Sequence, residues 1–332
     1  MLIDTGIGAQ GALALFPHLT SLTALRDFNL SLNTIGPEGA SALGSHLTGL
    51  ASLTHLVLAA CRIGSRGVAA LAPHLSALHH LVLAANEIGA EGAMALAPHL
   101  ATLTCLTHLS LAGNEVGVQG ATSLGPRLAT LTALRHLNLA EVDMCAEGAR
   151  ALAPHLAPLT SLTGLNVAGN KFGAEGAREM APHIAYLESL QQLHLDGNSI
   201  GAKGACALAP HLTSLLSLRH LDLENNKIGS EGANAVGPYL CSLTSLRVLH
   251  LESNSIGSEG ATTLAPYLAT LSSLRVLCLR WNWIGSEGAR ELVHHLSHTQ
   301  FLTYLDLKFT SDIDSGVQAE LQSKLPNVWL LI

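Results

Sequence analysis

Residues 246–261 read Leu-Arg-Val-Leu-His-Leu-Glu-Ser-Asn-Ser-Ile-Gly-Ser-Glu-Gly-Ala, and this pattern returns along nearly the whole chain. Its first leucine recurs every 28 residues, with one spacing of 25, and a partial copy over residues 1–24 precedes the full ones. The eleven full copies have their first leucines at Leu25, Leu53, Leu78, Leu106, Leu134, Leu162, Leu190, Leu218, Leu246, Leu274 and Leu302. Self-similarity at a fixed short period is typical of stacked repeats, so residues 1–332 are predicted to form a single repeat domain.

Within each copy the apolar residues change from a strand period to a helical period. Leu221 and Leu223 alternate with polar neighbours, which predicts a short strand with one buried face. Apolar residues then recur in steps of three and four over residues 232–246, which predicts one face of a helix. So small a unit cannot bury its apolar face alone, and the copies are expected to stack. The fold class is therefore an α/β solenoid with a parallel sheet on one side and helices on the other.

An asparagine follows the strand in most copies. Its amide is expected to bond loop backbone in adjacent copies, whose polar groups would otherwise be buried without partners. Cys61 takes this place in one copy and can form weak hydrogen bonds, whereas Val142 takes it in another and cannot, so the asparagine ladder is expected to be perturbed at Val142. The asparagines are Asn33, Asn86, Asn114, Asn170, Asn198, Asn226, Asn254 and Asn282.

Two features of the helical part break the regular pattern. Three residues are missing between Leu75 and Leu78, which removes nearly one helical turn. A proline inside a helix costs about 3 kcal/mol or more, so each helix is expected to bend or break where its proline stands, with the proline beginning a second short turn. The nine recurring prolines are Pro17, Pro73, Pro98, Pro126, Pro154, Pro182, Pro210, Pro238 and Pro266.

The pattern of residues 246–261 resembles leucine-rich repeats of the ribonuclease-inhibitor type, which also occur in the sensor domains of NOD-like receptors and in Ran GTPase-activating proteins. The resemblance covers nearly the whole chain. It implies a right-handed horseshoe with its sheet on the concave face and its helices on the convex face. It also implies binding of proteins, without catalysis in most members.

Composition argues against several classes of partner. The formal net charge is −7 with only 17 Lys and Arg residues, whereas a nucleic-acid-binding surface needs a basic stripe. Neither a leader peptide nor a long apolar run is present, so no membrane association is expected. Six cysteines without paired spacing are typical of free thiols in a reducing compartment, which favours the cytoplasm.

Residues that flank the two strand leucines are expected to point into the concave face, and they become charged and aromatic towards the C-terminus. Aromatic and arginine residues dominate interface hot spots, so this half is predicted to bind a protein partner. The alternative is that the rings shield the core of the last copy. The predicted partner-binding residues are Asp196, Asp222, Glu224, His250, Glu252, Arg280, Trp281, Trp283, Tyr304, Lys308 and Phe309.

Two alternatives to a recognition role stay open. Carboxylates on neighbouring strands repel unless something neutralises them, and a basic protein segment or a metal ion held together with His194 and His250 would do so. No spacing fixes a tetrahedral metal site, so neither a metal nor a cofactor is predicted. A GTPase-activating role would need a positioned Arg or Asn, for which Arg62 and Asn86 have the right type. No motif for a catalytic nucleophile or a phosphate-binding loop is present, and the chain is predicted not to be an enzyme.

The ends of the stack differ in their expected caps. Leu2 falls at the second strand leucine of the partial copy, so the first edge is expected to be uncapped and able to associate with another chain. Residues 311–332 are expected to cap the other end, with a helix from Asp312 to Leu325 and a last short strand within residues 326–332.

Overall fold

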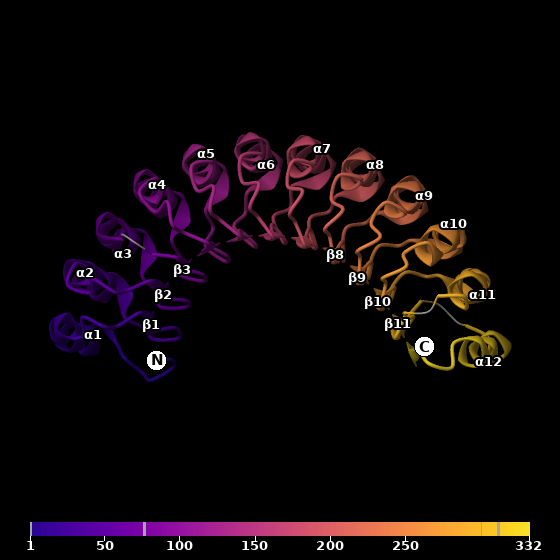
Figure 1. The fold of residues 1–332 in the computed structure, drawn as a ribbon, viewed down its shortest axis with the longest axis horizontal. Coiled ribbons are helices and arrows are strands. Elements are labelled where there is room, and N and C mark those ends of the chain that lie inside the picture. Colours follow the sequence, from indigo (N-terminus) through magenta and orange to yellow (C-terminus); the bar gives the residue numbers. More distant parts are fainter. Residues whose placement is uncertain (1, 76–77, 300, 311–312) are drawn as a thin grey trace. The chain divides into compact units, whose positions relative to one another are not determined.

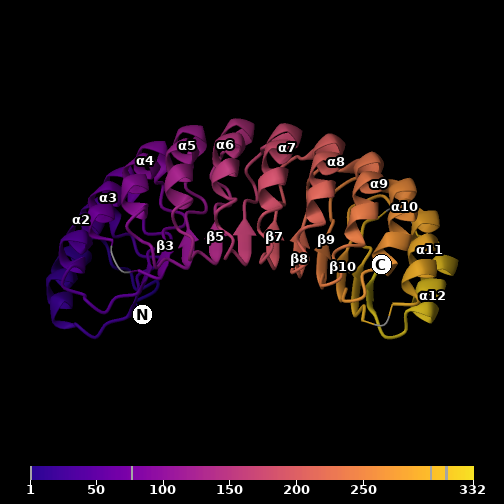
Figure 2. The same cartoon turned by 45° about the horizontal axis from the view of Figure 1, so that its top comes forward.

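The computed structural model describes residues 2–75, 78–299, 301–310 and 313–332. It divides into two compact units, Met1–Asn170 and Lys171–Ile332. In each unit, three-residue strands line the inner, concave side of an arc and helices form its outer side (Figures 1 and 2). Each unit is therefore an α/β solenoid, as the repeat predicts.

The first unit carries six strands that pair in parallel and in chain order. They are β1 (Asp27–Asn29), β2 (His55–Val57), β3 (His80–Val82), β4 (His108–Ser110), β5 (His136–Asn138) and β6 (Gly164–Asn166). Its helices are α1 (Ala9–Leu15), α2 (Gly36–Leu47), α3 (Gly64–Leu71), α4 (Gly89–Leu100), α5 (Gly117–Leu128) and α6 (Cys145–Leu152).

The second unit repeats this arrangement, and its strands also pair in parallel and in chain order. The strands are β7 (Gln192–His194), β8 (His220–Asp222), β9 (Val248–His250), β10 (Val276–Cys278), β11 (Tyr304–Asp306) and β12 (Trp329–Leu331). The helices are α7 (Gly173–Ile184), α8 (Gly201–Leu212), α9 (Gly229–Leu240), α10 (Gly257–Ala269), α11 (Gly285–Leu296) and α12 (Ser315–Lys324).

The core lies between the strands and the helices of each unit. In β2 to β11 the middle residue of the strand, such as Leu221, is buried, and so is the leucine two residues before the strand, such as Leu218. One detail of the prediction is wrong: α9 ends at Leu240, so Leu243 and Leu246 do not lie on the helix. They are nevertheless buried, because they anchor the segment that returns from the helix to the next strand.

Each helix from α2 to α11 begins at a residue with a left-handed backbone, and this explains the first glycine of the Ile-Gly-x-x-Gly-Ala segment. Gly257, for example, has φ +69°, a conformation that glycine adopts without steric cost. Cys145 stands at this point in α6 with φ +53°, in the same copy as Val142. The second glycine serves close packing: a Cβ on Gly260 would lie 2.7 Å from Cγ2 of Ile256 and 3.1 Å from Cα of Ser230 on the neighbouring copy.

The prolines were expected to bend or break the helix; a break followed by a second short turn is found in three copies and is absent from six. The helix gives way to a separate 3-10 turn at Pro17, Pro73 and Pro154, in η1 (Phe16–Ser21), η2 (Ala72–His74) and η3 (Ala153–His155). The other six helices continue through their proline. There the proline lies in the last turn, so few helical hydrogen bonds are lost, and the leucine or isoleucine two residues later stays buried. The shortened copy contains η2, and its residues 76 and 77 lie outside the described residues.

The C-terminal elements agree with the predicted cap, with shifted bounds. The helix α12 runs from Ser315 to Lys324, with the side chain of Asp314 accepting a hydrogen bond from the backbone N–H of Val317. The strand β12 pairs in parallel with β11. Asp312, the predicted start of the helix, lies outside the described residues, as does residue 311.

Candidate functional site

The predicted partner-binding residues all lie on the strands of the second unit or in the loops that follow them. The parallel register sets one row across the sheet, because His194, Asp222, His250, Cys278 and Asp306 are neighbours at the last position of five consecutive strands. Two residues further on, a second row consists of Asp196, Glu224, Glu252, Arg280 and Lys308. These two rows, which we call the charged rows, bring the predicted acids and bases together.

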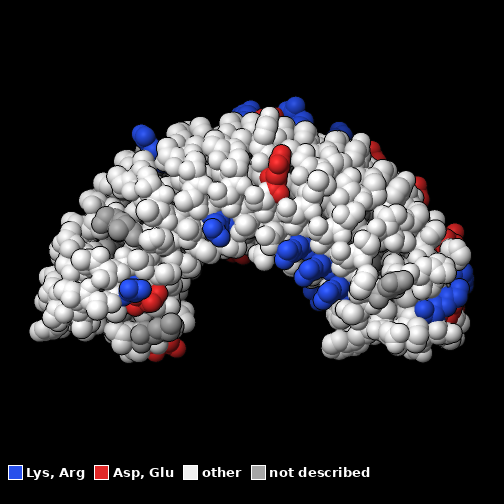
Figure 3. Space-filling model, viewed as in Figure 1, with Lys and Arg blue, Asp and Glu red and all other residues white. Residues whose placement is uncertain are grey.

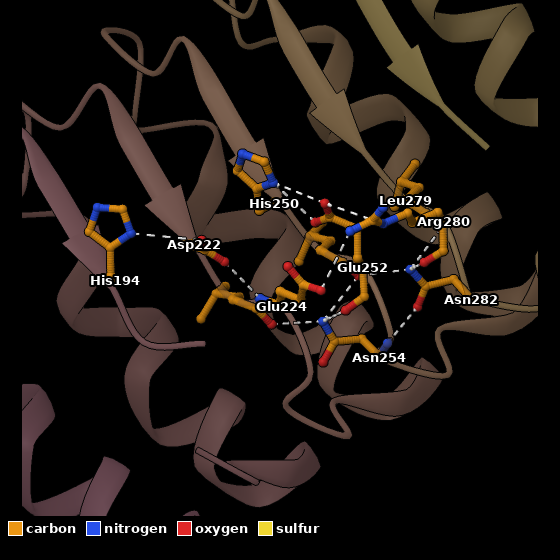
Figure 4. Close-up of polar contacts among 11 residues, drawn as sticks. His194, Asp222, Glu224, His250, Glu252, Asn254, Leu279, Arg280 and Asn282 are labelled. Atoms are coloured by element: carbon orange, nitrogen blue, oxygen red, sulfur yellow. Dashed lines mark hydrogen bonds and ion pairs between the residues drawn. The ribbon is translucent and has the colours of Figure 1, made fainter. Parts of the chain in front are cut away.

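Three acids of the charged rows, Asp222, Glu224 and Glu252, have ionic partners inside the chain. Nδ1 of His250 lies 3.0 Å from Oε1 of Glu252, which is only 3% exposed. Arg280 reaches both neighbouring acids, with Nε 3.9 Å from Oε1 of Glu252 and Nη2 3.8 Å from Oε1 of Glu224 (Figure 4). Nδ1 of His194 lies 3.7 Å from Oδ2 of Asp222. The expected repulsion is therefore reduced without an external cation or basic segment.

The titration of these groups follows from the pairing. Hydrogen bonds with Cys278 and with Glu252 raise the pKa of His250 to about 10, against the opposing effect of burial, so this imidazole is charged at neutral pH. Burial and the neighbouring Asp222 raise the pKa of Asp196, and burial together with Glu252 raises that of Glu224. Burial acts to raise the pKa of Asp222, but hydrogen bonds from His194 and from the backbone N–H of Glu224 outweigh it and lower the pKa.

The carboxylates of Asp222 and Asp306 also have a structural role. Each accepts a hydrogen bond at 3.0 Å from the backbone N–H two residues later, on Glu224 and Lys308 respectively. Asn138 forms the same contact with Ala140 in the first unit. Such local bonds from Asp and Asn side chains favour turns, so these residues help to turn the chain out of the strand.

An aromatic patch lies beside the charged rows, at the end of the unit. Trp281 and Phe309 stack with ring centroids 4.3 Å apart, and Tyr304 meets Trp329 edge to face at 5.6 Å. Exposure is 50% for Trp281, 62% for Phe309, 65% for Trp283 and 69% for Trp329. Rings exposed to this extent shield little of the core, and β12 pairs with the last repeat strand instead. We call Trp281, Trp283, Tyr304, Phe309 and Trp329 the aromatic patch.

Comparison with known proteins identifies the family of this arrangement. A family model described as Leucine Rich repeat matches residues 17–44, 49–72, 74–97, 102–125, 159–181, 186–209, 214–237, 242–265 and 270–293, which together are more than half of the chain. The chain belongs to the leucine-rich repeat family. The matched segments omit residues 126–158, where Val142 and Cys145 depart from the pattern.

The leucine-rich repeat fold of this chain also has a counterpart among solved structures. A chain of the crystal structure described as the Rad7 and Elc1 complex in yeast is similar, with a TM-score of 0.59, over 98% of this chain and 83% of that chain. The two are 16% identical in sequence, so the similarity concerns the fold. No curated protein matches this chain. Among the described residues, no helix has both the length and the apolar character needed to cross a bilayer.

Among the described residues, two groups of side chains on this leucine-rich repeat sheet could hold a metal ion. In each, the potential ligand atoms all lie within 4.8 Å of one another: His250, Glu252 and Cys278 in one, and His194, His220 and Asp222 in the other. Imidazole, carboxylate and thiolate are the ligands of zinc sites. His194, Asp222, His250 and Glu252 are among the residues that the repeat predicts for this surface, whereas His220 and Cys278 are not. The strand register could have pointed to Cys278, because it occupies the position beside His250.

Cys278, His250 and Glu252 also have the residue types of a nucleophile, a base and an orienting acid. Burial raises the pKa of the Cys278 thiol, which is 5% exposed, and this disfavours the reactive thiolate. Of the residues considered for GTPase activation, Asn86 is fully buried, and its amide donates to the carbonyls of Leu58 and Leu83. Arg62 is exposed in the loop after β2. Asn86 therefore belongs to the asparagine ladder, as the repeat predicts.

The four histidines that begin β2 to β5 form a stacked column in the first unit. The ring centroids of His55, His80, His108 and His136 follow one another at 5.5, 4.9 and 4.3 Å. Burial and the neighbouring imidazoles lower the pKa of His108 to about 4. The pKa of His80 and of His136 is also lowered, mainly by burial. These three rings are therefore neutral at neutral pH.

Proposed function

We propose that this leucine-rich repeat protein is a recognition scaffold, without catalytic activity or a cofactor, that binds a protein partner on the concave strand face of its second unit. The binding surface consists of the charged rows and the aromatic patch, over residues 190–309 and Trp329. The observation that carries the proposal is the exposure of three large rings, Trp281, Trp283 and Phe309, beside Arg280 and Lys308. Rings of this kind remove much apolar area from water when a partner covers them.

Several further observations support this proposal. The 28-residue unit with a helix in every copy supports placing the chain among repeats of the ribonuclease-inhibitor type, including those of NOD-like receptors. The similar solved chain comes from a complex of two proteins. Six free cysteines support a reducing compartment such as the cytoplasm. The internal pairing of Glu252 with His250 and Arg280 reduces the need for a metal ion and therefore favours a protein partner over a metal-dependent activity.

The proposal is tested by affinity capture with the double variant Trp281→Ala and Trp283→Ala. Partners are captured from lysate with the wild type, identified, and then titrated as purified proteins against both baits. A hot-spot ring contributes about 2 kcal/mol or more, so we expect at least a roughly 30-fold weaker dissociation constant.

A matched control is Tyr186→Ala with Leu216→Ala, two exposed apolar residues of the same unit that lie away from the strands. This control is expected to bind every partner as the wild type does. Unchanged affinity of the tryptophan variant for every partner, with equal thermal stability, would refute the proposed surface.

A further inference from the structure

Three arginines stand side by side at the edge of the second unit where its strands begin. Arg219, Arg247 and Arg275 immediately precede β8, β9 and β10. Backbone hydrogen bonds hold them in line, because the N–H of Arg247 donates to the carbonyl of Arg219 at 2.8 Å and the N–H of Arg275 donates to that of Arg247 at 2.8 Å. Figure 3 shows basic side chains in a row on the inner rim over these strands. We call these three residues the arginine ladder.

The arginine ladder carries three charges that no ion pair among the described residues neutralises. All three side chains are exposed. Neighbouring parallel strands lie only about 4.8 Å apart, so three like charges are held closer together than the Debye length of about 8 Å at physiological salt. Arg280 contrasts with them, since it lies between Glu224 and Glu252. An anionic ligand would supply the opposite charge that these three arginines lack.

The geometry points to an acidic peptide segment: we propose that the arginine ladder binds a stretch of about three carboxylate side chains in a protein partner. Each guanidinium can hold a carboxylate through two parallel hydrogen bonds. The ladder is short, because uncharged residues, Gln191 and Thr303, occupy the same position in the copies before and after it. Its length therefore fits a few side chains and no long anionic track.

The surroundings of the ladder disfavour nucleic acid as the occupant. Proteins that bind nucleic acid through its backbone commonly make about six to ten phosphate contacts, and three arginines supply too few. Asp222, the last residue of β8, follows Arg219 by three residues, or about 10 Å of extended backbone, and its carboxylate would repel a broad polyanion. The net charge of −7 also disfavours the binding of a polyanion such as nucleic acid. A narrow acidic peptide that follows the edge of the strands avoids this repulsion.

The test measures binding of a fluorescein-labelled hexaglutamate peptide to the full chain by fluorescence anisotropy at low and physiological salt. The ladder variant carries Arg219→Gln, Arg247→Gln and Arg275→Gln. Its matched control carries Arg66→Gln, Arg127→Gln and Arg150→Gln, which remove the same charge from exposed helix positions of the first unit. We expect the ladder variant to bind at least about tenfold more weakly than the wild type, the control to bind as the wild type does, and the affinity to fall with salt.

Several results would overturn the inference. Equal affinity of the wild type and the ladder variant for the peptide would show that the arginine ladder is not its binding site. An equal loss of affinity in the control variant would show that the peptide responds only to the net charge of the chain. If labelled oligothymidylate binds more tightly than hexaglutamate and loses affinity equally in the ladder variant, the ligand of the arginine ladder is a phosphate and the proposal of an acidic peptide is wrong. Since the probe is a defined peptide, the outcome is independent of the proposed function: the Trp281→Ala, Trp283→Ala variant should bind hexaglutamate as the wild type does.

Discussion

The buried asparagine that follows most strands joins its own copy to the preceding one. Oδ1 of Asn114 accepts hydrogen bonds from the backbone N–H groups of Asn86 at 2.8 Å and Ile88 at 3.3 Å. Its amide nitrogen donates to the carbonyls of Leu83 and Leu111, each at 2.8 Å. In the next copy Val142 can supply none of these bonds, and the buried N–H of Asn114 has no acceptor among the described residues. The perturbation predicted at Val142 is thus confirmed.

Replacing the valine should repair the asparagine ladder. We expect Val142→Asn to raise the free energy of unfolding by about 1–2 kcal/mol, because an unsatisfied buried N–H gains an acceptor. Thermal and urea unfolding measure this change. The control Val118→Asn makes the same substitution at an exposed position of α5 and should give no increase. A melting temperature of Val142→Asn at or below that of the wild type would contradict the role given to the ladder.

At the scale of elements, the helices stack closely because glycine and alanine face each other across neighbouring copies. In α9, a Cβ on Gly232 would lie 2.6 Å from Cγ2 of Ile228 and 3.0 Å from Cα of Ala202 on α8. The second of these atoms is backbone, so it cannot move without shifting the helix. The separation of α8 and α9 is therefore set by the absence of a side chain at one position.

We expect Gly232→Val to destabilise the chain by about 1–3 kcal/mol, because the added atoms force α8 and α9 apart or distort Ile228. Glu231→Val is the matched control, since Glu231 is exposed on the same helix and the substitution introduces the same side chain. It should change stability by no more than about 0.5 kcal/mol. Urea unfolding of the wild type and the two variants measures these changes in stability. Similar midpoints for both variants would show that the spacing of these helices is not limited by Gly232.

At the scale of the whole molecule, histidines of the two units respond to pH with opposite sign. In the first unit the rings of His80, His108 and His136 are neutral in the folded state, and the pKa of His108 is lowered to about 4. The contribution of the neutral His108 ring to the free energy of unfolding is fully present above the ordinary histidine pKa of about 6.5. It is lost as the pH falls towards 4. The pKa of His250 in the second unit is raised to about 10. Its contribution is complete below about 6.5 and is lost as the pH rises towards 10.

These two responses can be separated by substitution. We expect His108→Gln to flatten the fall in melting temperature between pH 6.5 and 4, and His250→Gln to flatten the fall between pH 6.5 and 10. Melting temperatures across this range, compared with the wild type, provide the measurement. Identical pH profiles for all three proteins would show that neither imidazole is linked to folding.

The sequence predicted the parts of the molecule that depend on the repeat alone. Strand positions, the asparagine ladder and the cap strand follow from the period and from the need to satisfy buried backbone groups. The continuous helix through Pro266 did not follow, because the cost of a proline depends on how near it lies to the end of the helix. Helix bounds were also misjudged, since Leu243 repeats in helical steps but lies in the returning segment.

The candidate surface was predictable in its residues but not in its contacts. The columns of the repeat bring Glu252 and Arg280 to the loops after neighbouring strands, whereas their ion pair depends on side-chain conformations that no periodicity sets. Trp329 was missed because β12 lies outside the repeat, so its register beside Tyr304 is known only from the fold. The arginine ladder was missed because its position lies one residue before the strand.

The asparagine ladder also bears on how a chain of this kind can change length. Each asparagine reaches backbone atoms that mostly lie 26, 28 or 31 residues earlier, as Asn254 does with Ile228, Asn226 and Leu223. A gene duplication or deletion of one complete copy therefore brings equivalent backbone atoms back to each asparagine. A duplication or deletion of another length leaves these atoms without their hydrogen-bond partners. Recombination between modules should thus yield folded descendants of many sizes, and shorter insertions should survive only on the helical side, where one module already lacks three residues.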